Sequence, residues 1–287
     1  MKTALIYGFG YVGRAFARQL LADGWSACAI TRSQEGQAAA GIAGVSALDL
    51  LDTDAIAAAV ARASAILVTA APDDGGCPGF ASLHGALSEA PQLPRWIGYL
   101  SSTSVYGDRA GQWTDEDCPL AARSPQGLRR AAAERTWLEL NVPPTCITVF
   151  RLSGIYGPGR SPFDRLRRGT ARRLARPGHI TSRIHVDDIV SALRASLSRP
   201  RGGAIYNLSD DEPASSAEVM RYAAHLLAVP PPPLEPFTAA TNIPPAARRF
   251  HEESRRISNS LARRELGWMP AHPSYREGLA AILAAGG

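Results

Sequence analysis

Residues 3–13 read TALIYGFGYVG, and this stretch decides the fold. Its first part, Thr3–Tyr7, is a short apolar run that is typical of a buried strand. Its second part has the spacing Gly-x-Gly-x-x-Gly and opens a helix that we predict over Tyr11–Ala22. The glycines therefore stand between a strand and a helix, which is the context in which this spacing binds a dinucleotide.

Each glycine of this motif has its own role in such a site. Gly8 permits the tight turn, Gly10 lets the backbone approach a pyrophosphate, and Gly13 lets the helix pack closely on the strand. The helix N-terminus offers free N–H groups and a partial positive charge to the phosphates. The alternative interpretation is a glycine-rich turn without a ligand. The predicted phosphate-binding residues are Gly8, Phe9, Gly10, Tyr11, Val12 and Gly13.

Short apolar runs alternate with helical patterns along the first half of the chain. A helix is expected over residues 52–63, and helical patterns also precede the later strands. Continuous apolar strands that alternate with helices form a parallel sheet covered on both faces. The sequence therefore predicts a doubly wound parallel α/β sheet, with strands at Thr3–Tyr7, Ser26–Thr31, 65–70, 96–101 and 145–151.

The pattern changes after about Arg151. The segment Gly157-Pro158-Gly159 interrupts the chain, an arginine-rich stretch follows, and Pro230–Pro233 predicts a stiff extended linker. We predict a dinucleotide-binding domain over residues 1–155 and a mostly small substrate-binding lobe over residues 156–287. Within the second part, residues 184–200 are expected to pack back on the sheet. Further helices are predicted at 187–198, 259–266 and Tyr275–Ala284.

The composition of the 287 residues narrows the class of protein. Apolar residues make up 45% of the chain, which is enough for a substantial core. No run approaches the ~20 apolar residues of a membrane span, and no secretory signal pattern is present. The net charge of +5 is almost all arginine, and no nucleic-acid motif accompanies it. Scattered cysteines without CxxC spacing indicate reduced thiols in a cytoplasm and argue against a zinc site; they are Cys28, Cys77, Cys118 and Cys146.

The choice of cofactor is predicted from the end of the second strand. An acidic residue there would hold the ribose 2′-hydroxyl of NAD, but the chain has Thr31, Arg32 and Ser33. Arg32 can pair with a 2′-phosphate, so we predict NADP, with NAD as the alternative if Arg32 is only a solvated surface residue. Asp49 is either an acceptor for the adenine amino group or a loop residue. The predicted cofactor site also includes Leu50, Thr69, Ala70, Ala71, Leu152, Gly154 and Ile155.

Five further segments carry a resemblance to a known family. They are residues 100–107 (LSSTSVYG), 114–116 (TDE), 151–159 (RLSGIYGPG), 183–188 (RIHVDD) and 206–208 (YNL). Together with the glycine motif, they resemble the extended short-chain dehydrogenase/reductases, the group of UDP-galactose 4-epimerase and the sugar-nucleotide dehydratases. The resemblance covers nearly the whole chain. It implies a nicotinamide cofactor and a small-molecule substrate.

The resemblance places the catalytic Ser/Thr at Ser102, but the family's Tyr-x-x-x-Lys motif is degenerate. Residues 124–130 read SPQGLRR, so Gln126 stands at the tyrosine position and Arg130 at the lysine position. Gln126 has no titratable proton and cannot act as a general acid or base. Arg130 can still hydrogen-bond the cofactor ribose, but it stays a fixed cation. No tyrosine lies between Tyr106 and Tyr156, so no shift of the alignment restores the motif.

Two classes of function stay open. The first is an NADP-dependent reductase or epimerase/dehydratase-like enzyme, in which Ser102 polarises a substrate carbonyl and water or another side chain supplies the proton. The second is a dinucleotide-binding protein without chemistry, a redox sensor or scaffold. His185 is either a replacement acid or, as we prefer, a cap for the small lobe. An arginine-rich segment is either an anion-binding rim or, as we prefer, a solvated helix face; it contains Arg160, Arg165, Arg167, Arg168, Arg172 and Arg173.

A homodimer is also predicted. Family members commonly pair through the two helices that flank the active-site strand, here near residues 79–89 and 126–140. The second helix has more apolar surface than one face against a sheet requires, although ordinary core packing is the alternative. The apolar residues in question are Ala131, Ala132, Trp137, Leu138 and Leu140.

Overall fold

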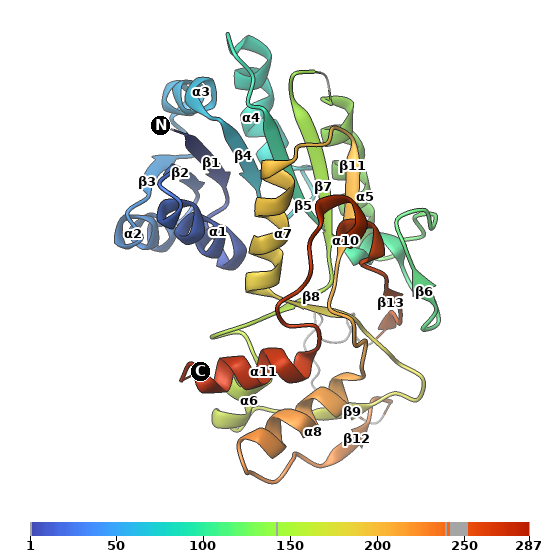
Figure 1. Cartoon of the computed structure of the whole chain (residues 1–287). Helices are drawn as coiled ribbons and strands as arrows, with labels where there is room; N and C mark the ends of the chain where they lie inside the picture. Colours follow the sequence, from blue (N-terminus) through green and yellow to red (C-terminus); the bar gives the residue numbers. More distant parts are fainter. Residues whose placement is uncertain (1, 142, 239, 242–251, 287) are drawn as a thin grey trace.

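The computed structural model describes residues 2–141, 143–238, 240–241 and 252–286. Seven strands pair in parallel in the order β11-β7-β5-β4-β1-β2-β3 (Figure 1). The predicted doubly wound parallel sheet is therefore confirmed. The strand order reverses between β1 and β4, where folds of this kind have a crevice at the carboxyl edge. The strands are β1 (Thr3–Tyr7), β2 (Ser26–Thr31), β3 (Ser46–Asp49), β4 (Ala65–Val68), β5 (Trp96–Ser102), β7 (Cys146–Leu152) and β11 (Ala204–Leu208).

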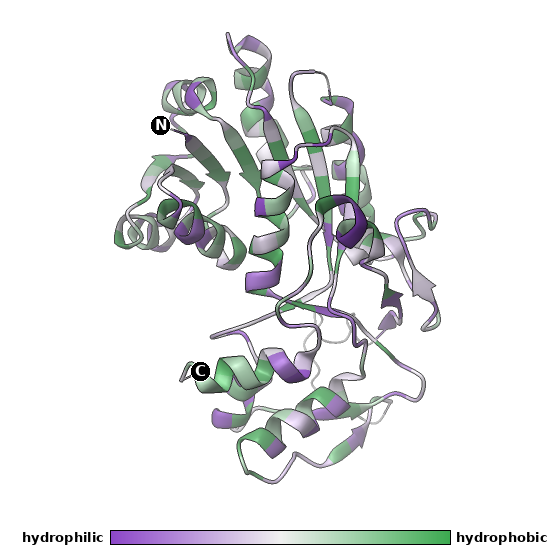
Figure 2. Ribbon diagram, viewed as in Figure 1, coloured by the Kyte–Doolittle hydropathy of each residue, from purple (hydrophilic) through white to green (hydrophobic). Residues whose placement is uncertain are grey.

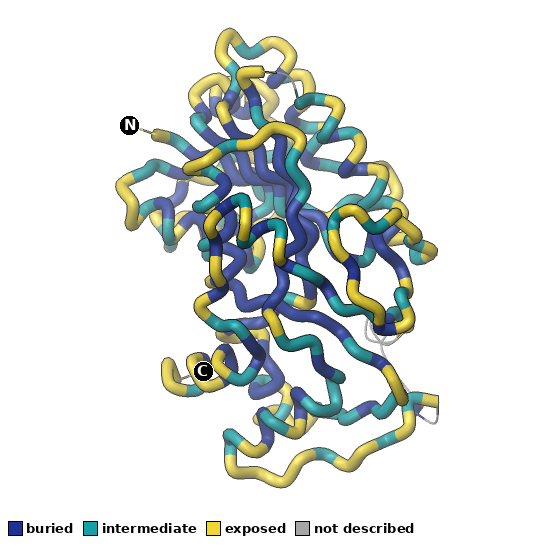
Figure 3. The backbone as a smooth tube through the Cα atoms, turned by 45° about the vertical axis from the view of Figure 1, so that its right-hand side comes forward, coloured by how far each residue is buried: buried dark blue, intermediate teal, exposed yellow. Residues whose placement is uncertain are grey.

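Helices cover both faces of this sheet. On one face, Phe16 and Leu20 of α1 (Tyr11–Ala22) pack with α7 (Val186–Ser198), α2 (Gln34–Ile42) and α10 (Ser260–Leu266). The other face carries α3 (Thr53–Arg62), α4 (Pro78–Glu89) and α5 (Pro125–Glu139). In β1, Ala4 and Ile6 face the first layer, and Leu5 and Tyr7 face the second. Because both faces are covered, the central strands β1 and β4 are buried and apolar along most of their length, as Figures 2 and 3 show for the buried centre.

A second lobe lies beyond the carboxyl edge and has its own small core. Tyr156, Phe163, Val219 and Leu279 belong to this core. It is built by α6 (Pro162–Arg167), α8 (Ser216–Leu226) and α11 (Tyr275–Ala284) (Figure 1). A 3-10 helix, η1 (Thr103–Tyr106), follows β5. Three short parallel pairs are also present: β8 (Gly154–Tyr156) with β10 (Arg183–His185), β9 (Arg173–Ala175) with β12 (Leu234–Pro236), and β6 (Trp113–Thr114) with β13 (Arg256–Ile257).

The chain crosses between the two lobes more than once. After the predicted boundary near residue 155, α7, β11 and α10 all return to the sheet. The predicted return of residues 184–200 corresponds to α7, whereas β11 and α10 were not assigned to the sheet from the sequence. The proline run at residues 230–233 separates α8 from β12. No helix among the described residues is long and apolar enough to span a membrane.

The apolar residues of α5 serve mainly the chain's own core. Trp137 is fully buried and stacks on Tyr99 of β5, with ring centroids 6.2 Å apart. Leu138 and Leu140 pack against the same cluster, and Ala131 packs against Tyr106. Core packing therefore accounts for much of the apolar surface behind the homodimer prediction, which stays a prediction.

Candidate functional site

The three glycines of the first turn meet different surroundings. Gly8 has a φ of 93°, and a Cβ there would lie 2.6 Å from Oγ1 of Thr69. A Cβ on Gly13 would lie 2.5 Å from the carbonyl oxygen of Gly8. Neither position tolerates a side chain, because the turn and the strand–helix contact are too close. Gly10, in contrast, borders open space, because a Cβ added there would have no atom within 4 Å.

The N-terminus of α1 is open to an anion. Gly10 is the N-cap, no side chain caps the helix, and no acidic residue lies in its first turn. The N–H groups of a helix start need partners, and here neither a hydroxyl nor a carboxylate supplies one. This open start, together with the free space over Gly10, fits the pyrophosphate of a dinucleotide.

The residues predicted to select the cofactor lie at the end of β2. Arg32 is exposed and forms no ion pair with a described residue. Ser33 caps α2, since its Oγ accepts from the N–H of Gly36 at 3.0 Å, so its hydroxyl proton remains free for a ligand. Asp49 is the last residue of β3 and accepts from the N–H of Leu51 at 2.9 Å. One Asp49 oxygen thus has a loop role, one of the two alternatives left open by the sequence, and the other accepts no hydrogen bond from a described residue.

The other predicted cofactor residues converge on the same edge of the sheet. Thr69 follows β4, and its hydroxyl donates to the carbonyl of Gly8 at 2.6 Å. β4 ends at Val68 rather than at residue 70 as predicted, although the N–H of Thr69 still donates to the carbonyl of Tyr7 in β1 at 2.9 Å. Parallel strands bring their carboxyl ends together. The sheet therefore gathers Thr31, Asp49, Leu50, Thr69, Ala70, Ala71, Leu152, Gly154 and Ile155 from separate parts of the chain.

The degenerate catalytic positions lie at the end of β5 and the start of α5. Ser102 ends β5, is half-buried, and accepts from the N–H of Ser104 at 3.2 Å, so its own hydrogen can be donated. Gln126 is exposed in the first turn of α5 and makes no hydrogen bond with a described residue. Arg130, one turn later, donates to the carbonyl oxygen of Leu100. The guanidinium of Arg130 is thus held against β5 at Leu100, two residues before Ser102 in the strand.

A buried ion pair lies behind these residues, on the side of the core. Arg151 of β7 donates to both carboxylate oxygens of Glu134, with a closest distance of 2.8 Å, and both side chains are at most 4% exposed. Ser101 donates to the same carboxylate at 2.5 Å. Burial alone would lower the pKa of Arg151, but its hydrogen bonds to Glu134 raise it. Glu134 was not recognised from the sequence, although its spacing with Gln126 and Arg130 places all three on one helix face.

The ion pair continues into the segments that carried the family resemblance. Arg151 donates to the hydroxyl of Tyr106 at 2.8 Å, and Tyr106 donates to Oδ1 of Asn207 at 2.9 Å. The N–H of Asn207 donates to Glu116 at 2.7 Å. These four segments therefore brace the carboxyl edge of the sheet through hydrogen bonds between buried and partly buried groups.

Burial raises the pKa of three tyrosines near the site. Burial raises the pKa of Tyr106 to about 12, and its hydroxyl is already engaged. Burial also raises the pKa of Tyr156, whose hydroxyl donates to the carbonyl of Ser274 at 3.3 Å. Tyr99 is fully buried against Trp137, and burial raises its pKa as well. The hydroxyls of Tyr106 and Tyr156 are therefore engaged in contacts within the fold.

His185, Asp188 and His272 form a cluster at the start of α7. The two imidazole centroids are 4.0 Å apart. The possible ligand atoms of the three side chains lie within 4.8 Å of one another, which is close enough to hold one metal ion, and no other such group occurs among the described residues. However, the carboxylate of Asp188 already accepts from the N–H groups of Ala271 (2.6 Å) and His272 (3.2 Å). His185 caps α7 by accepting from the N–H of Asp187, and its ring also lies edge-on to Tyr156 of the small lobe, with centroids 5.2 Å apart. The cluster thus docks the segment before α11 onto α7.

This cluster predicts how stability depends on pH. The hydrogen bond to Asp188 raises the pKa of His272, whereas burial and the neighbouring His272 lower the pKa of His185. A raised folded-state pKa stabilises the protein below the ordinary value of 6.5, and this stabilisation is lost as the pH rises through the raised pKa. The lowered pKa of His185 has the opposite effect. As the pH falls below 6.5, the folded protein becomes less stable, because His185 is harder to protonate in the folded state than in the unfolded state.

We therefore expect the free energy of unfolding to fall on both sides of about pH 6.5. In His272→Gln, the fall above that pH should be reduced. Urea unfolding of both proteins at a series of pH values measures this. Parallel curves for the two proteins above pH 6.5 would show that His272 does not carry the effect.

The arginine-rich segment forms separate contacts rather than a continuous rim. Arg172 pairs with Glu235 at 2.6 Å, and Arg173 donates to the carbonyl of Pro232 at 3.1 Å. Arg183, which lies outside this segment in β10, is buried and donates to the carbonyl of Ala214 at 2.9 Å. The guanidinium of Arg160 lies instead over the ring of Tyr11 in the glycine motif, 5.7 Å from its centroid.

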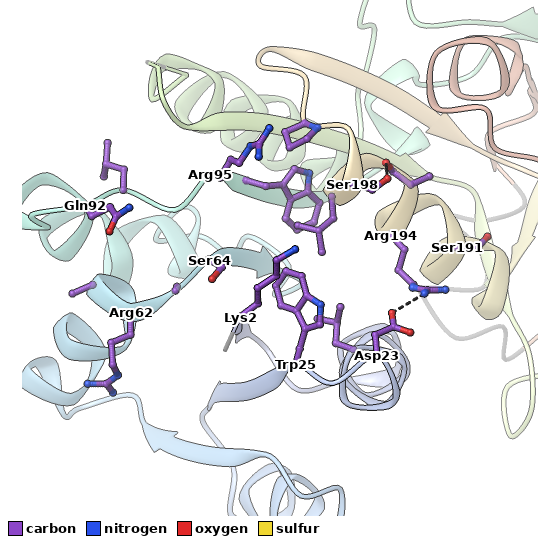
Figure 4. Close-up of a pocket in the computed structure, with 18 residues that line it drawn as sticks. Lys2, Asp23, Trp25, Arg62, Ser64, Gln92, Arg95, Ser191, Arg194 and Ser198 are labelled. Carbon is purple, nitrogen blue, oxygen red and sulfur yellow. Dashed lines mark hydrogen bonds and ion pairs between the residues drawn. The ribbon is translucent and has the colours of Figure 1, made fainter.

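A cavity of about 830 Å³ lies at the opposite, amino edge of the sheet (Figure 4). Several of its charged lining residues already have structural partners or roles. Asp23 pairs with Arg194 at 2.6 Å, and the Lys2 amine lies 5.3 Å from the Trp25 ring centroid. Arg62 lies in the last turn of α3, where a cation stabilises the helix C-terminus. None of the predicted cofactor residues lines this cavity.

Known proteins resemble this chain in sequence and in structure. Residues 89–209 match the NAD dependent epimerase/dehydratase family. Protein YeeZ of Escherichia coli is 33% identical over 248 residues, which cover 81% of this chain and 86% of YeeZ. The 3-diazoavenalumate denitrifying reductase of a Streptomyces species is 35% identical over 180 residues, which cover 58% of this chain and 57% of that protein. A functionally unknown conserved protein from Silicibacter pomeroyi superposes with a TM-score of 0.90 and 39% identity, covering 100% of this chain and 99% of the other.

Proposed function

This chain belongs to the NAD-dependent epimerase/dehydratase family, and we propose that it binds NADP in preference to NAD at the carboxyl edge of its sheet. The observation that carries the preference is Arg32. It follows β2, where the 2′ position of the adenosine ribose lies in dinucleotide folds, and it has no ion-pair partner among the described residues. The hydroxyls of Thr31 and Ser33 flank it, and no carboxylate occupies the position that would hold a free 2′-hydroxyl.

We further propose that the protein is a reductase or epimerase/dehydratase-like enzyme that acts on a small carbonyl compound. When bound, the nicotinamide supplies the hydride chemistry. Ser102 would donate its hydroxyl hydrogen to the substrate carbonyl oxygen, and Arg130 would place a fixed positive charge beside the cofactor ribose. Gln126 would supply no proton, so water or another side chain would do so. The Streptomyces relative is named a reductase, which supports this class; sugar nucleotides are a further substrate class to test.

The second candidate function is dinucleotide binding without chemistry. The exposed, unbonded Gln126 favours it, because the side chain at the general-acid position makes no contact with a described residue that would orient a reacting group. The side chain of Arg130 is also engaged by the carbonyl of Leu100. In this case the protein would report the redox state of the cofactor or present it to a partner. Turnover of any substrate that depends on Ser102 would exclude this alternative.

Calorimetric titration of NADPH and NAD into the wild type and Arg32→Ala tests the cofactor preference. We expect the substitution to weaken NADPH binding roughly tenfold to a hundredfold, because a charge-assisted contact is worth ~1.5–3 kcal/mol. NAD binding should stay unchanged. Arg62→Ala, which removes an exposed arginine at the opposite edge of the sheet, is the matched control. Equal affinities for NADPH and NAD in all three proteins would overturn the preference.

A further inference from the structure

We propose that Arg160 binds the pyrophosphate of the cofactor, so that the turn leading into the second lobe contributes a charged ligand to the phosphate site. This inference rests on the proposed dinucleotide binding. It assigns a role to one arginine of the segment that was expected from the sequence to be a solvated helix face. Three observations carry it: the geometry of the turn, its contact with the glycine motif, and the unpaired charge of Arg160.

The turn that holds Arg160 is short and closed. Residues 157–160 (GPGR) follow β8, and the N–H of Arg160 donates to the carbonyl of Gly157 at 3.0 Å. The N–H of Gly157 donates back to the carbonyl of Arg160 at 3.3 Å. Two reciprocal bonds fix the backbone of Arg160 relative to β8. The position from which its side chain extends is therefore set before any ligand binds.

This turn is docked on the first helix of the dinucleotide site. The hydroxyl of Tyr11, the residue after Gly10, donates to the carbonyl of Pro158 at 2.9 Å. A Cβ on Gly157 would lie 2.4 Å from that hydroxyl and 2.7 Å from Cγ1 of Val186, so only glycine permits this approach. Segments 147 residues apart in the chain are thereby held together at the open N-terminus of α1.

The charge of Arg160 is free for a ligand. Its side chain forms no ion pair with a described residue, whereas neighbouring acids have other partners. Asp164 accepts from both the N–H (2.7 Å) and the hydroxyl (2.9 Å) of Ser161, and Asp187 lies 4.0 Å from Arg18. Arg160 lies 5.7 Å from the Tyr11 ring centroid, beside a helix start that has no acidic residue.

A pyrophosphate is the anion that this arrangement suits. It carries two negative charges, while the backbone N–H groups of the glycine motif supply only partial charge. The planar guanidinium of an arginine matches two phosphate oxygens at once. Because NADP and NAD share the pyrophosphate, Arg160 should contribute equally to the binding of both. Arg32 should contribute only where a 2′-phosphate is present.

The experiment compares NADPH and NAD affinities of the wild type, Arg160→Ala, Arg32→Ala and the control Arg168→Ala by calorimetry. Arg168 is an exposed arginine of the same lobe and gives the same change in charge. We expect Arg160→Ala to weaken both cofactors by the same factor, about tenfold to a hundredfold, and to leave their affinity ratio unchanged. Arg160→Lys should restore part of the loss. Raising the salt concentration should weaken NAD binding more in the wild type than in Arg160→Ala.

The outcomes separate this inference from the proposed function. If the wild type binds neither cofactor, the proposed function fails. If the wild type binds a cofactor and Arg160→Ala binds it as tightly as Arg168→Ala does, the inference is wrong while the proposed function stands. A loss confined to NADPH would place Arg160 at the 2′-phosphate and also overturn the inference. The melting temperature of each unliganded variant establishes that the exposed substitution leaves the fold intact.

Discussion

Glu134→Ala should lower the free energy of unfolding by about 3–5 kcal/mol, because it leaves the buried guanidinium of Arg151 without its carboxylate. Arg151 is 3% exposed and directs three of its hydrogen bonds at Glu134. Ser101 would lose its acceptor as well. The cost is large because a buried cation can be stabilised neither by water nor by a new partner.

The matched control is Glu212→Ala. Glu212 forms a similar two-oxygen contact with Arg276, at 3.0–3.1 Å, but both side chains are 38% exposed. Solvent-exposed pairs contribute about 0–1 kcal/mol, so this variant should unfold almost like the wild type. Urea unfolding of both variants measures the difference. Equal losses in the two variants would show that burial of the Glu134–Arg151 pair does not determine its importance.

Ser102→Ala should lower the rate of carbonyl reduction by about a hundredfold to a thousandfold, because removal of one donor to a developing oxyanion has an effect of this size. The activity to follow is found by offering aldehydes, ketones and sugar nucleotides together with NADPH. Cofactor affinity should stay unchanged, since Ser102 is proposed to contact the substrate. Ser104→Ala, two residues further along, is the control; the backbone N–H of Ser104 donates to Ser102, and its own hydroxyl has no assigned role.

Gln126→Ala tests the degenerate acid position in the same assay. A positioned general acid–base group contributes ~10²–10⁴ in rate, but Gln126 has no proton to exchange and its side chain is exposed. We therefore expect both turnover and cofactor affinity within about twofold of the wild type. Loss of turnover with intact cofactor binding would mean that Gln126 positions the substrate. If no compound turns over and Ser102→Ala changes nothing, binding without chemistry becomes the better account.

The start of the fold could be predicted from the sequence because its determinants are local. The structure places β1, α1 and β2 at the predicted residues, Thr3–Tyr7, Tyr11–Ala22 and Ser26–Thr31. An apolar run, a glycine spacing and a helical period each act within a few residues of the chain. The parallel sheet followed from the alternation of such units. The place of Arg32 at the carboxyl edge followed in turn, because a strand end in a parallel sheet lies at that edge.

Contacts between distant segments could not be predicted in this way. In the sequence, Arg151 is a residue of a family motif and Glu134 is an ordinary residue of a predicted helix. In the structure, the two form the buried ion pair behind the site. Asp188 meets His272 across 84 residues, and Tyr11 meets Pro158 across 147. A period or a spacing indicates which face of an element is buried, but not which residue of another element lies opposite.

The sequence by itself thus determined the sheet, the glycine turn between β1 and α1, and the presence of Gln126 and Arg130 at the Tyr and Lys positions, since each is a property of residue types at short spacing. Only the tertiary structure decided which charges are free and which are engaged. Arg172, Arg173 and Arg183 have partners within the chain, whereas Arg160 is left without a carboxylate from the described residues beside the open start of α1. The reason is physical: the free energy of a charged side chain depends on its burial and its neighbours, and folding brings those neighbours from distant parts of the chain.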